Sequence, residues 1–88
     1  MNIKTSHGNF KIRDLPFADR RKLHRLEIQA VSSNGEITRD KYFDILEWVM
    51  NFAFEKPEKQ LGKFDDNIVD EILGSIYQEY KDLSKKKT

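Results

Sequence analysis

Residues 39 to 54 read RDKYFDILEWVMNFAF, and the arrangement of the rest of the chain can be worked out from this stretch. Apolar side chains recur in it every three or four residues, which predicts an amphipathic helix. One continuous face carries Tyr42, Ile45, Leu46, Val49, Phe52 and Ala53. Four more apolar side chains lie outside that face or at its margins, namely Phe43, Trp48, Met50 and Phe54. We therefore expect this helix to be central in the fold or to contact a partner as well as its own core.

An earlier helix is predicted from about residues 15–17 to Val31. Its apolar stripe consists of Leu23, Leu26 and Ala30, widened by Ile28 and Val31. Asp14 offers a capping oxygen for this helix, and Pro16 suits its first turn, where the missing N–H is not required. The sequence SSNG at residues 32–35 favours turns and left-handed backbone, so the helix should end before it.

After residue 54 the chain predicts a connector and then a long helix. Pro57, Gly62 and the charges of residues 55–63 are typical of a connector, with Leu61 as its anchor in the core. The apolar residues that follow step by 4, 3, 4 and 3, namely Val69, Leu73, Ile76, Tyr80 and Leu83. Ile72 and Tyr77 broaden this face, and the spacing predicts a helix.

Capping residues mark the starts of the last two helices. Thr38 is a suitable N-terminal cap for the helix over 39–54, and Asp40 places negative charge in its first turn. Asp65 or Asp66 can cap the final helix. If Asp65 is the cap, Phe64 and Val69 occupy the positions of a hydrophobic staple.

The first fifteen residues predict a β-hairpin. Asn2 to Thr5 and Phe10 to Arg13 flank a turn over residues 6–9, and the second segment alternates apolar and charged side chains. Such a hairpin needs a helix against its apolar face. We therefore expect one mainly α domain over residues 1–83, with an N-terminal β-hairpin followed by three α-helices, and a disordered basic tail over 84–88.

Composition excludes several kinds of chemistry. The chain has 88 residues, a net charge of +1, 38% hydrophobic and 35% charged residues, and no cysteine, which fits one small domain without thiol chemistry. His7 and His24 lack the spacing of a metal site, so we expect neither a metal nor a cofactor. Ser75 has no visible catalytic base, and an enzyme is therefore the least favoured class. The longest apolar-rich stretch, residues 45–54, is too short to span a bilayer, and the first twelve residues contain no signal-peptide core.

A basic cluster in the first predicted helix raises the possibility of nucleic-acid binding. Residues 1–25 carry a net charge of +5, and the cluster consists of Arg20, Arg21, Lys22 and Arg25. Phosphate contacts require basic side chains on a common surface, and Arg21 and Arg25 share a helix face. An ordinary charged outer face explains the cluster better, because the apolar helix over 39–54 is a poor reader of base edges. A small nucleic-acid-binding regulator thus remains an alternative.

The aromatic side chains of residues 43–54 instead indicate a protein-binding surface. Three helices and a hairpin cover only part of so broad an apolar helix, so some side chains should be partly exposed. The candidate contact residues are Phe43, Trp48, Met50, Phe52, Phe54, Tyr77 and Tyr80. Trp48, Phe52 and Phe54 are the expected anchors, with Tyr77 or Tyr80 as a flanking wall. A structural subunit that pairs only with copies of itself is a further alternative.

Three segments carry a family resemblance. The sequence FKIRDLPF at residues 10–17, followed by DRRKL at 19–23, is similar to the opening of tail assembly chaperones from long-tailed bacteriophages. Residues 42–48, YFDILEW, resemble the central helix of those proteins, and residues 72–80 resemble their last helix. The resemblance implies a small, mainly helical, non-catalytic protein of the host cytoplasm. Its expected partners are the tape-measure protein and the tail-tube protein, kept soluble until the tail assembles.

Overall fold

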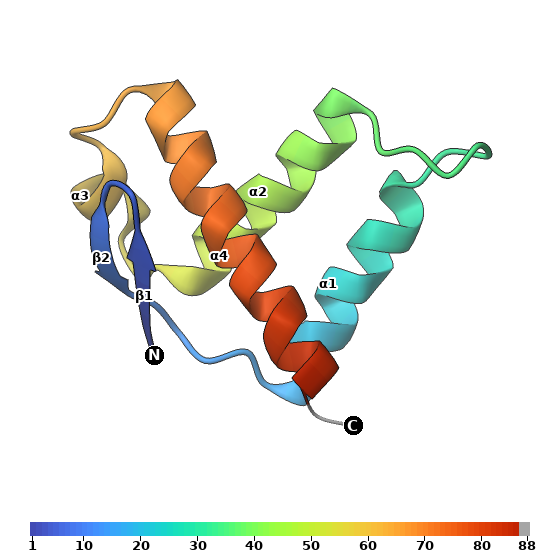
Figure 1. Cartoon of the computed structure of the whole chain (residues 1–88), viewed down its shortest axis with the longest axis horizontal. Helices are drawn as coiled ribbons and strands as arrows, with labels where there is room; N and C mark the ends of the chain where they lie inside the picture. The colour runs from blue at the N-terminus through green and yellow to red at the C-terminus, as the bar shows by residue number, and fades with distance from the viewer. Residues whose placement is uncertain (87–88) are drawn as a thin grey trace.

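A computed structural model describes residues 1–86 and confirms a mainly helical chain with an N-terminal antiparallel hairpin (Figure 1). The elements, in order, are β1 (Asn2–Thr5), β2 (Gly8–Lys11), α1 (Phe17–Ala30), α2 (Arg39–Ala53), α3 (Pro57–Leu61) and α4 (Asp66–Lys86). α4 packs against α2 and β1, and α2 also packs against α1. Figure 1 shows the loop between α1 and α2 at the opposite end of the molecule from the hairpin and α3.

The helices differ from the sequence predictions in two respects. The expected connector contains the short helix α3, in which Pro57 occupies the first turn and the good helix formers Glu, Lys, Gln and Leu follow. The backbone of α4 continues to Lys86, so residues 84–86 are not the disordered tail that we expected. Lysine is a good helix former, which favours this extension of the backbone helix. Residues 87 and 88 of the predicted tail lie outside the described residues.

The capping predictions have mixed outcomes. Asp65 is confirmed as a cap of α4, because its Oδ1 accepts a hydrogen bond from the Ile68 N–H at 3.0 Å. The prediction for Asp14 is wrong: its carboxylate lies 3.2 Å from the N-terminal ammonium, and Pro16 holds the capping position of α1 without a side-chain bond. Thr38 precedes α2 as expected but makes no capping bond to the backbone. Its hydroxyl instead bonds the Asp40 carboxylate and lowers the pKa of that group.

The hairpin has a tighter turn than predicted. β2 begins at Gly8, whose positive φ of 124° is a conformation that glycine adopts at little cost. Ile3 faces Phe10 in the antiparallel register, and the Ile12 N–H extends the pairing by donating to the Met1 carbonyl at 2.7 Å. Ile3 is buried against the helices, which supply the apolar cover that a two-stranded hairpin needs.

One core joins all of these elements. Its most deeply buried side chains are Ile45, Val49, Phe54, Ile72, Leu73, Ile76 and Tyr80. Leu61 of α3 is also buried, as predicted for the anchor of the connector. Two tyrosine hydroxyls are used across the core: Tyr80 donates to the Arg13 carbonyl at 2.6 Å, and Tyr77 donates to the Glu27 carboxylate at 2.5 Å.

Candidate protein-binding surface

Exposed apolar side chains are concentrated in residues 28–43, which form the end of α1, the following loop and the start of α2. We call this set the distal apolar patch; its members and exposed fractions are Ile28 62%, Val31 43%, Ile37 40%, Tyr42 38% and Phe43 47%. Among residues 1–82, whose side chains the structure describes, the only other large apolar side chain exposed to this degree is Phe17, at the start of α1. An apolar cluster at one end of a small protein is a feature of interaction surfaces.

Backbone hydrogen bonds order the loop that carries the patch. Val31 and Ile37 pair through an antiparallel β-bridge. Between them the Ser32 N–H donates to the Glu36 carbonyl at 2.8 Å, and the Gly35 N–H donates to the Ser32 carbonyl at 2.9 Å. Gly35 has a φ of 84°, which an L side chain adopts only with strain. The patch is therefore held by a defined turn, as the sequence SSNG predicted.

Tyr42 connects the patch to α4. Its ring lies edge-on to the Tyr77 ring, with centroids 6.2 Å apart. A Cβ on Gly74 would lie 3.2 Å from the Tyr42 hydroxyl oxygen, so the absence of a side chain there leaves room for this tyrosine. Gly74 of α4 thus accommodates a side chain of α2.

The seven predicted contact residues fall into three classes of burial. Phe43 is exposed, and Trp48, Met50 and Phe52 are partly buried. Phe54, Tyr77 and Tyr80 are buried in the core, so their assignment as contact residues is wrong. Phe54 follows the last turn of α2, where its ring meets the Phe10 ring edge-on at 6.2 Å. Burial raises the pKa of both tyrosine hydroxyls; hydrogen bonding to Glu27 raises that of Tyr77 further, and the charge of Asp14 does so for Tyr80.

The two apolar margins of α2 lie on different sides of the helix. Trp48 and Phe52 stack with ring centroids 5.1 Å apart, and the Arg13 guanidinium lies 5.7 Å from the Phe52 centroid. Phe43 and Met50 are seven residues apart, which places them on the same side of α2, away from Trp48 and Phe52. Trp48 and Phe52 are thus largely occupied by contacts within the chain, whereas Phe43 has free surface.

A groove that the sequence analysis did not identify lies beside Met50. It encloses about 430 Å³ between α2, α3 and the start of α4. Its apolar lining comes from Met50, Pro57, Leu61, Phe64 and Val69. Its charged lining residues, Glu58 and Asp66, are both acidic. We call this groove the Met50 groove. The sequence contained little indication of it, because the groove depends on α3, and that segment was predicted to be a connector.

The four residues of the predicted basic patch do not form one surface hollow. Arg20 and Arg21 line a hollow of about 370 Å³ between α1 and α4, together with His24, Glu27 and Lys81. Lys22 and Arg25 are not among its lining residues, and Lys22 lies 3.7 Å from the Asp19 carboxylate. The Arg20 guanidinium is 5.0 Å from the Phe17 centroid, which ties this cation to an aromatic ring.

Within the part of the chain that the structure describes, no three His, Cys, Asp or Glu residues are placed so as to hold a metal ion. None of the described helices combines the length and hydrophobicity needed to cross a bilayer. Comparisons of the chain with protein-family models, with curated proteins and with solved structures found no match.

Proposed function

We propose that this chain is a non-catalytic assembly chaperone of a long-tailed bacteriophage, which binds an apolar segment of the tape-measure protein or the tail-tube protein and keeps it soluble. The observation that carries the proposal is the distal apolar patch, in which five apolar side chains are between 38% and 62% exposed. The similarity of residues 10–23, 42–48 and 72–80 to tail assembly chaperones supports the choice of client.

The patch has the properties that reversible binding of an apolar client requires. Its turn is ordered by backbone hydrogen bonds, so little conformational entropy is lost on binding. Covering the exposed half of a side chain such as Phe43 or Ile28 contributes about 1 kcal/mol, so the five together contribute about 5 kcal/mol before association costs. The patch alone therefore binds weakly, and further contacts along the client are needed for micromolar affinity. Weak contacts of this kind allow the client to be released during assembly.

The Met50 groove suggests the charge of the client. Its lining residue Met50 lies two turns along α2 from Phe43, on the same side of the helix, and its charged lining residues are the acidic Glu58 and Asp66. A client helix with an apolar stripe flanked by lysine or arginine would place its apolar side chains on the patch and its cations on this rim. We therefore expect clients of basic rather than acidic flanking sequence.

Co-expression with each candidate client tests the proposal, with the soluble fraction of the client as the readout. We expect the wild-type chain to raise that fraction and the double variant Ile28→Ser plus Phe43→Ser to abolish the gain. Phe17→Ser is the matched control, because Phe17 is 69% exposed and lies outside the patch. The proposal fails if no candidate client is solubilised, or if the control reduces the effect as much as the double variant does.

Self-association through the patch is separated by the same variants. If the patch pairs copies of this chain, light scattering of the purified protein will show a mass that rises with concentration, and Phe43→Ser will return it to that of the monomer. A chaperone that is monomeric without its client will show one mass throughout.

A further inference from the structure

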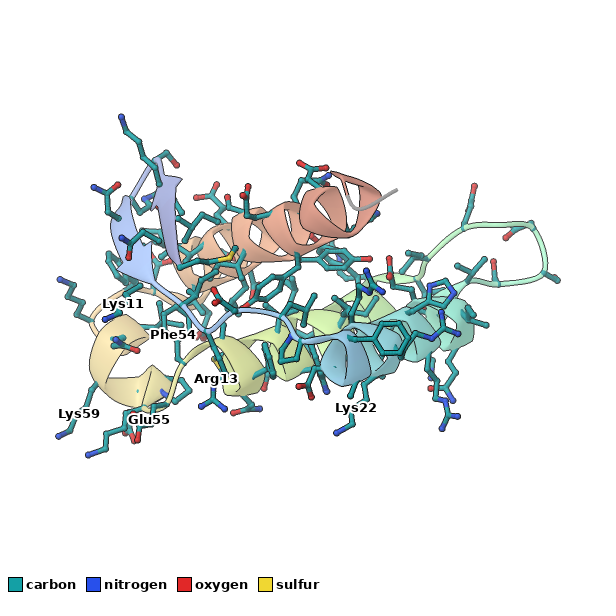
Figure 2. The ribbon with its side chains drawn as sticks, turned by 90° about the horizontal axis from the view of Figure 1, so that it is seen from below. Lys11, Arg13, Lys22, Phe54, Glu55 and Lys59 are labelled. Carbon is teal, nitrogen blue, oxygen red and sulfur yellow. The ribbon has the colours of Figure 1, made fainter. Side chains whose placement is uncertain are left out.

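A basic hollow lies at the hairpin end of the molecule, on a different face from the patch. It encloses about 470 Å³ where the chain leaving β2 meets the end of α2 and the helix α3. Four cationic side chains line it, namely Lys11, Arg13, Lys56 and Lys59, and Glu55 is the single acidic lining residue. Figure 2 shows Lys11, Arg13, Glu55 and Lys59 around Phe54, with Lys22 further along the molecule.

The floor of the basic hollow is rigid. Ile12 and Phe54 are buried beneath it, and the Arg13 N–H donates to the Ala53 carbonyl at 3.1 Å, which ties the chain after β2 to the end of α2. The Arg13 guanidinium is also held against the Phe52 ring. The four cations therefore come from segments far apart in the sequence but are kept close together by the core.

The lysines of the hollow form no ion pairs with the side chains that the structure describes. No ion pair joins Lys11, Lys56 or Lys59 to any carboxylate among the residues whose side chains the structure describes. Like charges gathered around one concave surface repel each other and raise the local concentration of anions. An anionic ligand would remove that repulsion, and several anionic groups along one chain would engage the cations together.

We propose that the basic hollow binds an acidic peptide segment, rich in aspartate or glutamate, of a partner protein. A nucleic acid is a poorer fit, because the aromatic lining residue, Phe54, is buried and offers no face on which a base could stack. The Glu55 carboxylate and the Gln60 side chain can also accept hydrogen bonds from the N–H groups of a peptide backbone. Three of the four cations are lysines, which pair with carboxylates without demanding a fixed geometry.

Fluorescence anisotropy with a labelled glutamate-rich peptide tests this site on the full chain. We expect the peptide to bind at low salt, with an affinity that decreases as salt rises. Lys11→Glu plus Lys59→Glu should weaken binding at least about tenfold, because two attractions become repulsions. Lys22→Glu plus Arg25→Glu is the matched control, since it makes the same change in net charge outside the hollow.

Each outcome decides the proposal. Binding that is lost in the first variant and kept in the second supports it, whereas equal loss in both means attraction to net charge and overturns it. Absence of peptide binding at low salt overturns it as well, as does hollow-dependent binding of an oligothymidine strand in place of the peptide. In NMR spectra of the wild-type chain, the backbone amide chemical shifts of residues 11–13 and 55–60 should change when the peptide is added. Changes confined to other residues would refute the site without any variant.

This inference is independent of the proposed function, because the two sites share no residue. Variants of the basic hollow should leave client solubilisation unchanged, and variants of the distal apolar patch should leave peptide binding unchanged. Failure of one proposal is therefore distinguishable from failure of the other.

Discussion

Truncating two phenylalanines of the same segment to alanine should have opposite consequences. Phe54 is 2% exposed and belongs to the core, whereas Phe43 is 47% exposed and belongs to the distal apolar patch. We expect Phe54→Ala to destabilise the fold strongly. Phe43→Ala should leave folding nearly unchanged and weaken client binding.

The structure sets the size of both effects. Removing a fully buried phenylalanine costs about 3–5 kcal/mol, and loss of the edge-on pair with Phe10 places Phe54→Ala near 4 kcal/mol. A chain of this length has a total stability of about 4–13 kcal/mol, so the variant loses a large share of it. At about 4–8 °C per kcal/mol the melting temperature should fall by about 15–30 °C. For Phe43→Ala the loss of about 1 kcal/mol of partial burial is offset by about 0.5 kcal/mol of better helix propensity.

Urea and thermal unfolding followed by circular dichroism measure these differences directly. The denaturant slope should be the same in all three proteins, so that a shift of midpoint reports stability alone. Similar midpoints for Phe54→Ala and the wild type would refute the assignment of Phe54 to the core. A large loss of stability in Phe43→Ala would refute its place on the free surface and, with it, the reasoning for the patch.

Two further predictions concern ionisation in the core and the exposed cap of α4. Burial raises the pKa values of Tyr77 and Tyr80 in the folded state, whereas unfolded tyrosine has its ordinary pKa of about 10. Above that pH the folded state keeps two protons that the unfolded state loses. The free energy of unfolding should therefore be unaffected by these groups below about pH 10 and fall above it by up to about 2.7 kcal/mol per pH unit. The variant Tyr42→Phe leaves Tyr77 and Tyr80 as the only tyrosines of the chain. As the pH is raised, the ultraviolet absorbance of tyrosinate should appear together with the loss of the helical circular-dichroism signal. Tyrosinate that appears while the helices persist would contradict the burial of these hydroxyls. Asp65→Ala should lower the free energy of unfolding by about 1 kcal/mol, because the Ile68 N–H loses its cap, and urea unfolding measures this loss. The neighbouring variant Asp66→Ala should cost less. The opposite order would show that Asp66 is the cap.

Local patterns predicted most of the secondary structure because they depend on neighbours in the sequence. The period of the apolar residues indicated α1, α2 and α4, the turn sequence SSNG indicated the loop, and Asp65 indicated the start of α4. The unpredicted helix α3 and the longer α4 both arise where the preferences for helix and coil are nearly balanced. The sequence after Pro57 forms a helix or a connector with similar ease, and a lysine-rich end frays or continues according to small differences.

The candidate surface was predicted only in part, for a physical reason. Apolar character shows that a side chain seeks burial, but it does not show whether the chain itself supplies the cover. Phe43 and Phe54 look alike in the sequence at the margin of α2, and one is exposed while the other is enclosed near the Phe10 ring. Tyr77 and Tyr80 have helical spacing that fits either a core or a contact wall, and their hydroxyl partners, Glu27 and the Arg13 carbonyl, come from distant segments.

The amino-acid order by itself therefore determined the helices, the hairpin and the surplus of apolar surface on α2, since each follows from residue periodicity and turn chemistry. Only the tertiary structure decided where that surplus lies, because the packing of α4 and the hairpin enclosed some aromatic rings and left the α1–α2 end uncovered. The basic hollow has the same origin. Its four cations lie in two segments more than forty residues apart, and the core that joins those segments creates the site.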